Sequence, residues 1–281
     1  MTDVERPAPL PLPLGASMLS VERAVDLGSR ILRQGRAHVG TLIAKGDRDF
    51  ATAVDLEVEA TVQAALREVA PDIPFLGEEH PGEEIGAGPI WVLDPIDGTV
   101  NFARESPLCG ISLALLDNGR PRLAVVDLPF MAERYLAVEG AGAYLNGRRI
   151  HCAAVHALRD AVVGMSDFSV GRDAPAENPL HLALVQALAA SALRVRLHGS
   201  EALDLAWTAA GRLGAAIMLS NLPWDVSAGV LLVREAGGMV LDLDGTHHTP
   251  GSRCTLACTR GLQQPILELI ATLPEARAFV A

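Results

Sequence analysis

The segment Trp91–Thr99 carries two aspartates at the end of a short apolar run. Asp94 ends the run, Pro95 removes a backbone donor and turns the chain, and Asp97 follows three positions after Asp94. Both carboxylates can therefore converge on one point. Carboxylate oxygens are the ligands that Mg²⁺ prefers, and Mg²⁺ commonly bridges such acids to a substrate phosphate. The spacing favours a magnesium site, and an ordinary turn with two aspartates is the alternative.

Gly98 and Thr99 continue this segment and predict the start of a helix, where free backbone N–H groups can bind an anion. Glu78 and Glu79 also follow a short apolar run, and Asp225 stands at the start of another expected helix. Taken singly, these acids are typical of a solvated loop and of a helix cap. Together with Asp94 and Asp97, they indicate one acidic site beside a phosphate cradle.

The elements that would position these residues alternate between helical and strand-like patterns. Helices are expected at residues 17–35, 52–69, 180–191, 202–210, 224–235 and 262–273. Strands are expected at residues 73–76, 90–93, 111–116, 123–128, 133–138, 162–165, 193–197, 239–243 and 255–258. A tight turn is expected at Asn146-Gly147, and residues 45–49 are interpreted as a polar, flexible connection.

This pattern predicts an α/β-layered (α+β) protein whose first sheet is largely antiparallel. Four prolines within residues 1–16 predict a disordered tail. Residues 17–150 are expected to form a first half that holds the metal site. Residues 151–281 are expected to form a second half with substrate-facing elements.

The composition excludes several classes of protein. Of 281 residues, 49% are hydrophobic, which is enough for a large core. The net charge of −11 makes nucleic-acid binding unlikely, because an acidic chain repels a phosphate backbone. We expect no membrane span and no secretory signal, hence a cytoplasmic protein. Lys45 is the only lysine among 23 basic residues, which suggests chemistry that arginine cannot perform; chance survival is the alternative.

Two motifs resemble the signatures of the inositol monophosphatase family. The first is Trp91-Val-Leu-Asp94-Pro-Ile-Asp97-Gly-Thr99-Val-Asn-Phe102. The second is Trp224-Asp225-Val-Ser-Ala-Gly229, followed by Glu235-Ala-Gly-Gly238. Gly77-Glu78-Glu79 and Ala51-Thr-Ala-Val-Asp55 match further upstream elements, so the resemblance spans nearly the whole chain.

The resemblance implies a five-layered αβαβα sandwich, usually a homodimer. It also implies Mg²⁺-dependent, lithium-sensitive hydrolysis of a small phosphomonoester by metal-activated water. By position, Glu78, Asp94 and the Ile96 carbonyl would bind one ion. Asp94, Asp97 and Asp225 would bind a second, and a weaker third ion would lie near Glu78.

The remaining assignments implied by the resemblance concern catalysis and the phosphate. Thr99 would orient the attacking water with support from Asp55, and Lys45 would lie in a mobile catalytic loop. Gly98 and Thr99 would offer backbone N–H groups to the phosphate. The substrate-facing positions would be Gly199, Ser200, Glu201 and Met218.

Met218 marks a departure from inositol-preferring relatives, which carry a hydroxyl-binding acid at that position. Met218 is either a changed pocket residue or part of the core, and Glu201 is a candidate replacement for the acid. An inositol, cyclitol or sugar phosphate is the favoured substrate class. The alternatives are a histidinol-phosphatase or other small-ester phosphatase, and a regulatory binding protein on the same fold. His247 and His248 are expected to face solvent in a turn.

Overall fold

The protein is described by a computed structural model that covers residues 18–37, 42–80, 82, 84–172 and 174–280. The tail expected at residues 1–16 lies outside this part of the chain. The helices are α1 (Met18–Gly35), α2 (Ala53–Val69), α3 (Thr99–Ala103), α4 (Ala174–Ser191), α5 (Glu201–Ala209), α6 (Pro223–Glu235), α7 (Gln263–Ala271) and α8 (Pro274–Val280).

The strands form a hairpin and two larger sheets. The hairpin consists of β1 (Leu42–Gly46) and β2 (Asp49–Thr52). The seven-stranded sheet contains β3 (Phe75–Gly77), β4 (Pro89–Asp97), β5 (Gly110–Asp117), β6 (Arg120–Leu128), β7 (Glu133–Val138), β8 (Gly142–Leu145) and β9 (Arg148–Ile150), in that order. The five-stranded sheet has the order β11 (Arg194–Leu197), β10 (Val162–Met165), β12 (Ala215–Met218), β14 (Thr255–Cys258) and β13 (Met239–Leu241).

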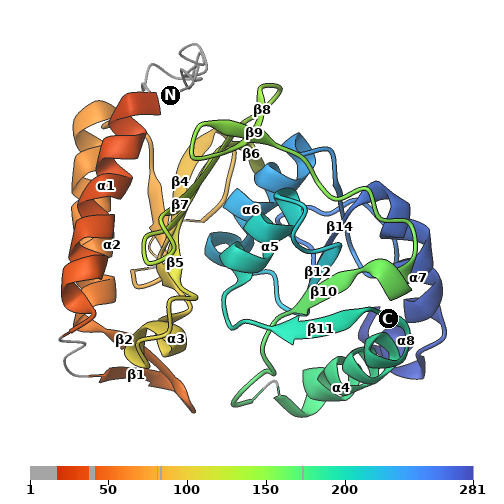
Figure 1. Ribbon diagram of the computed structural model, residues 1–281. Helices are drawn as coiled ribbons and strands as arrows, with labels where there is room; N and C mark the ends of the chain where they lie inside the picture. Colours follow the sequence, from red (N-terminus) through yellow and green to blue (C-terminus); the bar gives the residue numbers. More distant parts are fainter. Residues whose placement is uncertain (1–17, 38–41, 81, 83, 173, 281) are drawn as a thin grey trace.

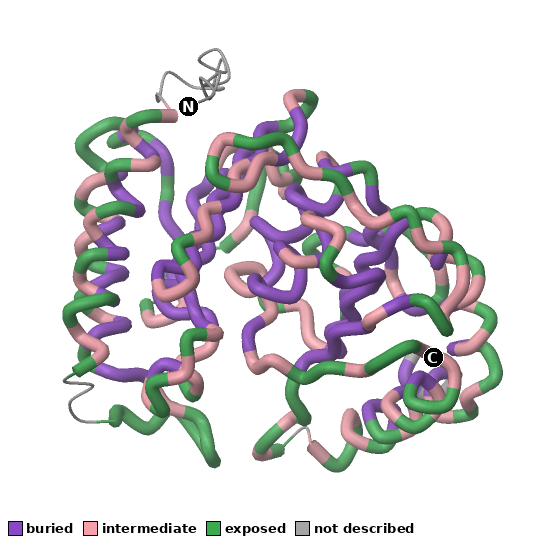
Figure 2. The backbone as a smooth tube through the Cα atoms, viewed as in Figure 1, coloured by how far each residue is buried: buried purple, intermediate pink, exposed green. Residues whose placement is uncertain are grey.

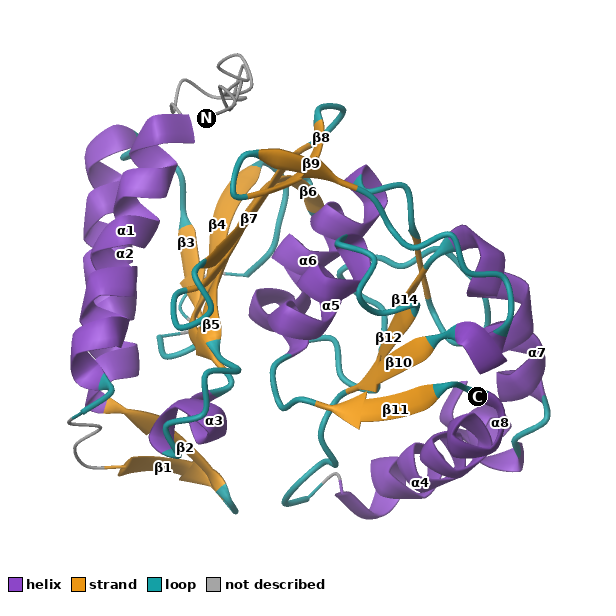
Figure 3. Cartoon of the chain, in the orientation of Figure 1, coloured by secondary structure: helices purple, strands orange, loops and turns teal. Residues whose placement is uncertain are grey.

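These elements stack as five layers, which confirms the predicted αβαβα sandwich (Figures 1 and 3). The order is α1 with α2, the seven-stranded sheet, α5 with α6, the five-stranded sheet, and finally α4, α7 and α8. All strand pairs of the first sheet are antiparallel except β3 with β4. The prevalence of hairpins in this sheet agrees with the turn signals in the sequence. The division of the chain into halves at residue 150 stays a prediction.

The outer helix layer follows from the spacing of apolar residues along α1 and α2. Val21, Val25 and Leu32 recur at helical spacing on α1, and each is fully buried. Figure 2 shows the same division, with buried backbone facing the sheet and exposed backbone facing solvent. At Gly28 the two helices approach closely, because an added Cβ would lie 2.9 Å from a Val62 methyl.

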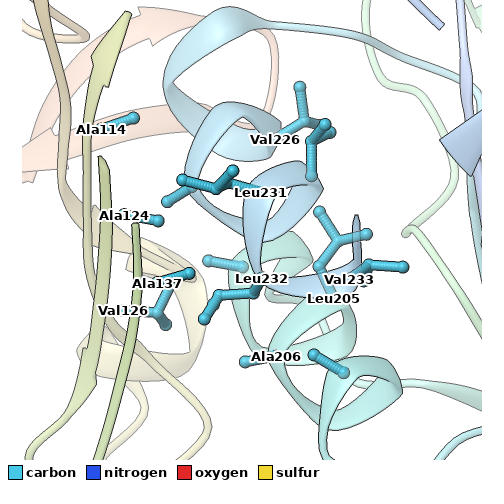
Figure 4. Packing of buried hydrophobic residues seen from close by; sticks show 14 of the residues in the cluster. Ala114, Ala124, Val126, Ala137, Leu205, Ala206, Val226, Leu231, Leu232 and Val233 are labelled. Atoms are coloured by element: carbon cyan, nitrogen blue, oxygen red, sulfur yellow. The ribbon is translucent and has the colours of Figure 1, made fainter. Parts of the chain in front are cut away.

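The central helix α6 is buried on nearly all sides, because both sheets pack around the α5–α6 layer. Figure 4 shows Leu231 and Leu232 of α6 facing small residues of the first sheet, among them Ala114 and Ala124. Small side chains on the sheet let the helix backbone approach. This packing brings α6, from the second half of the chain, onto the sheet that carries Asp94.

Gly229 sets the distance between α5 and α6, and its replacement tests this packing. An added Cβ would lie 2.3 Å from Leu205 Cβ, so the two helices would have to separate. We expect Gly229→Ala to lower the free energy of unfolding by about 1–3 kcal/mol, measured by urea denaturation. Gly86→Ala is the matched control, since no atom lies within 4 Å of its added Cβ. Equal stability of the two variants would contradict a close α5–α6 contact.

The structure differs from the expectations in several places. Residues 45–49 are not an irregular connection, because Lys45 lies on β1 and the chain returns along β2. The helix expected from residue 180 begins at Ala174 and contains Pro179, and α8 was not anticipated. β4 extends to Asp97 through a register shift between Asp94 and Asp97. In the described part of the chain, no helix combines the length and apolarity needed to span a membrane.

Candidate active site

Asp94 and Asp97 lie at the end of β4, and both are almost fully buried. The Ile96 backbone N–H donates to Asp94 Oδ1 at 2.9 Å, which holds the turn after Pro95. The Ile96 side chain is buried, whereas its backbone carbonyl accepts a hydrogen bond from the Thr99 hydroxyl at 3.1 Å. The local sequence therefore delivers two carboxylates and one carbonyl to the same edge.

Gly98 makes the turn from β4 into α3 possible. Its φ of +88° is the left-handed conformation that favours glycine, and an added Cβ would lie 2.9 Å from the Leu108 and Gly199 carbonyl oxygens. Thr99 then begins α3. Asn101 ties this turn to the second half of the chain, because its side-chain amide donates to the His198 and Gly199 carbonyls at 2.7 and 3.1 Å.

Asp55 joins the Thr99 hydroxyl to the start of α2. Thr52 and Asp55 form a capping box: the Thr52 N–H donates to Asp55 Oδ2 at 2.8 Å, and the Thr52 hydroxyl oxygen accepts from the Asp55 N–H. The Thr52 hydroxyl also donates to Asp55 Oδ2 at 2.5 Å. The Thr99 hydroxyl lies 3.1 Å from Asp55 Oδ1. Asp55 is fully buried. Its carboxylate is held in place by three hydrogen bonds, two from Thr52 and one from Thr99. The structure thus brings these two predicted catalytic residues into contact across 44 positions.

Glu78 and Glu79 follow β3 and meet Lys45 from the β1–β2 hairpin. The Lys45 ammonium lies 2.6 Å from Glu78 Oε1 and 2.7 Å from Glu79 Oε1. Partial burial acts to lower the pKa of Lys45, but hydrogen bonds and charges from the two glutamates raise it overall. Lys45 therefore stays charged and neutralises part of the acidic cluster.

Glu59 is a buried acid of this region that the sequence reading missed. It accepts a hydrogen bond from the Glu79 N–H at 2.9 Å and lies 2.7 Å from His80 Nδ1. Gly77 leaves room for it, because an added Cβ would lie 2.2 Å from Glu59 Oε2. The sequence could have indicated Glu59, because it follows Asp55 by four residues and therefore lies on the same face of α2.

The start of α5 holds Asp97 from the other side. The Ser200 hydroxyl donates to Asp97 Oδ2 at 2.5 Å, and the Ala202 and Glu201 N–H groups donate at 2.8 and 3.1 Å. Glu201 Oε1 accepts a hydrogen bond from Ser220 at 3.3 Å, whereas its Oε2 is buried with no hydrogen-bond partner among the described residues. Asp225 lies in the first turn of α6.

These residues line one pocket of about 200 Å³. Its lining combines acids, backbone and hydroxyl groups from both halves of the chain. The residues are Glu78, Asp94, Ile96, Asp97, Gly98, Thr99, Asp167, Gly199, Ser200, Glu201 and Asp225. Asp167 lies beside Gly199, where an added Cβ would be 3.0 Å from the Asp167 carboxylate.

Met218 does not reach this pocket. It is fully buried on β12 and belongs to the core between the two sheets. The assignment of Met218 as a substrate contact is therefore corrected: Met218 is a core residue, which was the alternative interpretation. β12 is covered on both faces, so its sequence shows no alternation that would tell pocket from core.

The expectation that His248 faces solvent is also wrong, because this residue is buried. Its Nε2 lies 2.8 Å from Asn221 Oδ1 and 2.9 Å from Thr255 Oγ1. His247 is exposed, as expected.

The acids of the pocket raise one another's pKa. Burial, followed by the charges of Glu78, Asp97 and Asp225, raises the pKa of Asp94 well above its usual range. Burial also raises the pKa of Asp225, with further contributions from Glu201 and Asp97. Burial raises the pKa of Asp97 to about 6, although three hydrogen bonds oppose the shift, and that of Glu201 to about 8. A cation would relieve this repulsion.

The donor set fits a hard divalent cation, because it consists of carboxylates and a backbone carbonyl. The buried, unpartnered Glu201 Oε2 is further evidence of an acceptor-rich site that lacks donors. In the arrangement described here, no three histidine, cysteine, aspartate or glutamate side chains form a ready-made ligand group. Glu78 lines the pocket and also pairs with Lys45 at 2.6 Å.

The pKa shifts predict how stability changes with pH in protein stripped of divalent cations. A carboxyl group whose pKa is higher in the folded chain binds more protons there, so the free energy of unfolding falls as pH rises. The pKa of Asp97 is raised from 3.8 to about 6, and burial raises that of Glu79 from 4.5 to about 7. In EDTA, we therefore expect the thermal midpoint to fall between about pH 4 and about pH 7.

Saturating Mg²⁺ is expected to flatten this dependence, because the ions replace the protons that the cluster would otherwise bind. Differential scanning calorimetry with and without Mg²⁺ measures both slopes. A thermal midpoint that rises over this pH range in EDTA would contradict the repulsion between these carboxylates.

Comparison with known proteins places this fold in a class of phosphatases. Residues 19–275 match the inositol monophosphatase family. The inositol-1-monophosphatase ImpA of Mycolicibacterium smegmatis is 40% identical over 228 residues, which cover 81% of this chain and 82% of that protein. The Nus factor SuhB of Pseudomonas aeruginosa is 37% identical, covering 82% of this chain and 86% of that protein.

A solved structure shows the same architecture. The extragenic suppressor protein suhB from Bartonella henselae superposes with a TM-score of 0.84 at 28% identity, covering 90% of this chain and 97% of that one. The chain therefore belongs to the inositol monophosphatase family and is a phosphoric monoester hydrolase.

Proposed function

We propose that this protein is a Mg²⁺-dependent phosphatase that hydrolyses a small inositol-, cyclitol- or sugar-like phosphomonoester. The observation that carries the proposal is that an acidic oxygen-donor site and a hydroxyl–carboxylate pair lie next to each other. Acids from β4, the β3 turn and α6 surround an oxygen-donor site, and the Asp55–Thr99 pair lies beside it. Two or three Mg²⁺ ions held there would neutralise the phosphate, activate water and stabilise the leaving alkoxide.

The protein groups then have separate roles. Glu78, Asp94, Asp97, Asp225 and the Ile96 carbonyl hold the cations. The Thr99 hydroxyl lies 3.1 Å from Asp55 Oδ1 and, with its proton directed there, would accept a proton from the attacking water while passing its own proton to Asp55. The backbone N–H groups of Gly98 and Thr99 bind the phosphate.

The alcohol part of the substrate meets a polar wall built by the second half of the chain. Ser200, Glu201 and Asp167 line this wall, and each can accept a hydrogen bond from a hydroxyl group. Because Met218 is buried in the core, Glu201 supplies the acid that position 218 lacks. A polyhydroxylated alcohol suits this wall better than an apolar one, since an apolar group would leave the carboxylates unpaired.

The substrate class is tested by phosphate release with Mg²⁺ from inositol 1-phosphate, aminocyclitol and sugar phosphates, histidinol phosphate and phenyl phosphate. We expect polyol esters to give the highest kcat/KM, and Li⁺ to inhibit. Glu201→Gln should lower kcat/KM for polyol esters more than for phenyl phosphate, which has no hydroxyl group to bind. A preference for phenyl or histidinol phosphate would overturn the polyol assignment, and histidinol phosphate would become the substrate.

A regulatory role is the second candidate, because several relatives are named Nus factor SuhB. The complete acidic set favours catalysis, since a binding scaffold does not need it. Capture of a specific protein partner by Asp94→Asn, together with no phosphate release from any ester by the native chain, would favour the regulatory role.

We further propose a cytoplasmic homodimer. β11 is an edge strand of the five-stranded sheet, and such edges can pair with another chain. Leu197, at the end of β11, is 40% exposed, and Leu193, just before it, is 47% exposed. Sedimentation equilibrium of the native chain and of Leu197→Glu measures this association. The native chain is expected to be a dimer and the variant a monomer.

A further inference from the structure

A second cavity, of about 690 Å³, lies away from the acidic pocket and shares no lining residue with it. It is enclosed by the β5–β6 turn, by α6 and by the segment at residues 247–250. Its accessible apolar floor consists of Pro121, Pro223 and Pro250, whereas Val226, Val230 and Leu231 of α6 lie beneath it and are at most 3% exposed. Figure 4 shows Val226 and Leu231 on this helix. The volume is in the range of small-molecule sites.

The cavity also holds two arginines that no described carboxylate neutralises. Arg120 begins β6, and Arg234 lies in the last turn of α6. Arg234 donates to the His248 carbonyl at 3.0 Å, a contact that leaves its charge uncompensated. Partial burial, and then repulsion from Arg120, lowers the pKa of Arg234. Both guanidinium groups therefore face the same cavity at a cost in electrostatic free energy.

The two acids that line the cavity are already engaged. Glu139 forms an ion pair with Arg122, and Glu235 accepts hydrogen bonds from the Gly140 and Gly142 N–H groups at 2.8 and 2.7 Å. His248 adds no positive charge, because burial and the nearby Arg234 lower its pKa to about 4. The cavity thus combines unpaired guanidinium groups with an apolar floor.

We propose that this cavity binds a small organic phosphate that carries an apolar ring. The phosphate would lie between Arg120 and Arg234, because guanidinium groups bind phosphate oxygens through paired N–H donors. The ring would cover Pro121, Pro223 and Pro250. The site is independent of the proposed catalysis, since none of these residues lines the acidic pocket.

Isothermal titration calorimetry with phenylphosphonate tests the proposal, because this probe has a phosphate-like head and a ring and is not hydrolysed. The full chain is titrated in EDTA, where the acidic pocket repels anions. We expect saturable binding by the native chain. Arg120→Gln and Arg234→Gln should each weaken binding by about tenfold or more, as expected for loss of a charged hydrogen bond.

Arg67→Gln is the matched control, because Arg67 is an exposed arginine on α2 that does not line the cavity. It removes the same charge and should leave the affinity unchanged. Methylphosphonate, which lacks the ring, should bind at least about tenfold more weakly. Equal affinity of the two phosphonates would overturn the role of the apolar floor.

Hydrogen exchange gives a second, independent measurement. The Asp225 and Val226 N–H groups bond to the Leu222 carbonyl, and Asn221, Pro223 and Val226 line the cavity. Phenylphosphonate should slow exchange in the peptide that covers residues 221–226. Absence of saturable binding by the native chain, or native-like affinity in the Arg120→Gln/Arg234→Gln double variant, would show that the cavity is not this anion site.

Discussion

Replacing Asp94 by asparagine is expected to lower kcat by on the order of 10³-fold, because charge stabilisation by the ions supplies several kcal/mol. Asp94 is almost fully buried at the end of β4, and Glu78, Asp97 and Asp225 all raise its pKa. A neutral amide removes the charge that two cations would share. The measurement is phosphate release under saturating Mg²⁺.

The same variant should fold and should be at least as stable as the native chain in EDTA. The amide relieves repulsion within the acidic cluster, whereas the carboxylate costs free energy there in the absence of cations. Asp72→Asn, at an exposed position outside the pocket, is the matched control for the change of charge. Full Mg²⁺-dependent activity in Asp94→Asn would show that the metal site is assigned wrongly.

Thr99→Ala has the second largest expected effect, a loss of about 10²- to 10⁴-fold in kcat, the usual contribution of general acid–base catalysis. The variant removes the hydroxyl that links the pocket to Asp55 at 3.1 Å. Mg²⁺ affinity, measured by calorimetry, should be unchanged, because the proposed ligands are other residues. Thr99→Ser keeps the hydroxyl and should retain most of the activity.

A double-mutant cycle with Asp55→Asn separates the proton relay from simple packing. If Asp55 acts through Thr99, the double variant should be no slower than Thr99→Ala alone. Additive losses in kcat would mean that the two side chains contribute independently. Asp55→Asn should also lower stability, because the Asp55 carboxylate accepts hydrogen bonds from the Thr52 N–H and hydroxyl at the start of α2.

Much of the site could be predicted from sequence where its geometry is local. An apolar run that stops at Asp94, with Pro95 and Gly98 placed to turn the chain, leaves few backbone paths. The start of α2 at Thr52 and the start of α6 near Asp225 depend on residues within one helical turn. These features were correctly placed because neighbouring residues determine them.

Contacts across long stretches of chain were decided only by tertiary structure. Ser200 reaches Asp97 across 103 positions, and Lys45 reaches Glu78 across 33. The polar residues at 45–49 suggested a flexible loop, yet they form the end of β1, the turn and the start of β2. Every residue of β1 is exposed, so no alternation of buried and exposed positions marked this strand. The burial of Glu59 depends on Gly77, which lies on another element.

The sequence by itself determined the acidic motifs, the turns that present them and the family to which the chain belongs. The tertiary structure decided which side of each element faces the pocket. Met218 and Glu201 show the difference, since both stood near the site in sequence, yet only Glu201 lines it. β12 is covered on both faces, so burial of Met218 follows from layer packing, whereas Glu201 begins α5 and projects where the two halves of the chain meet.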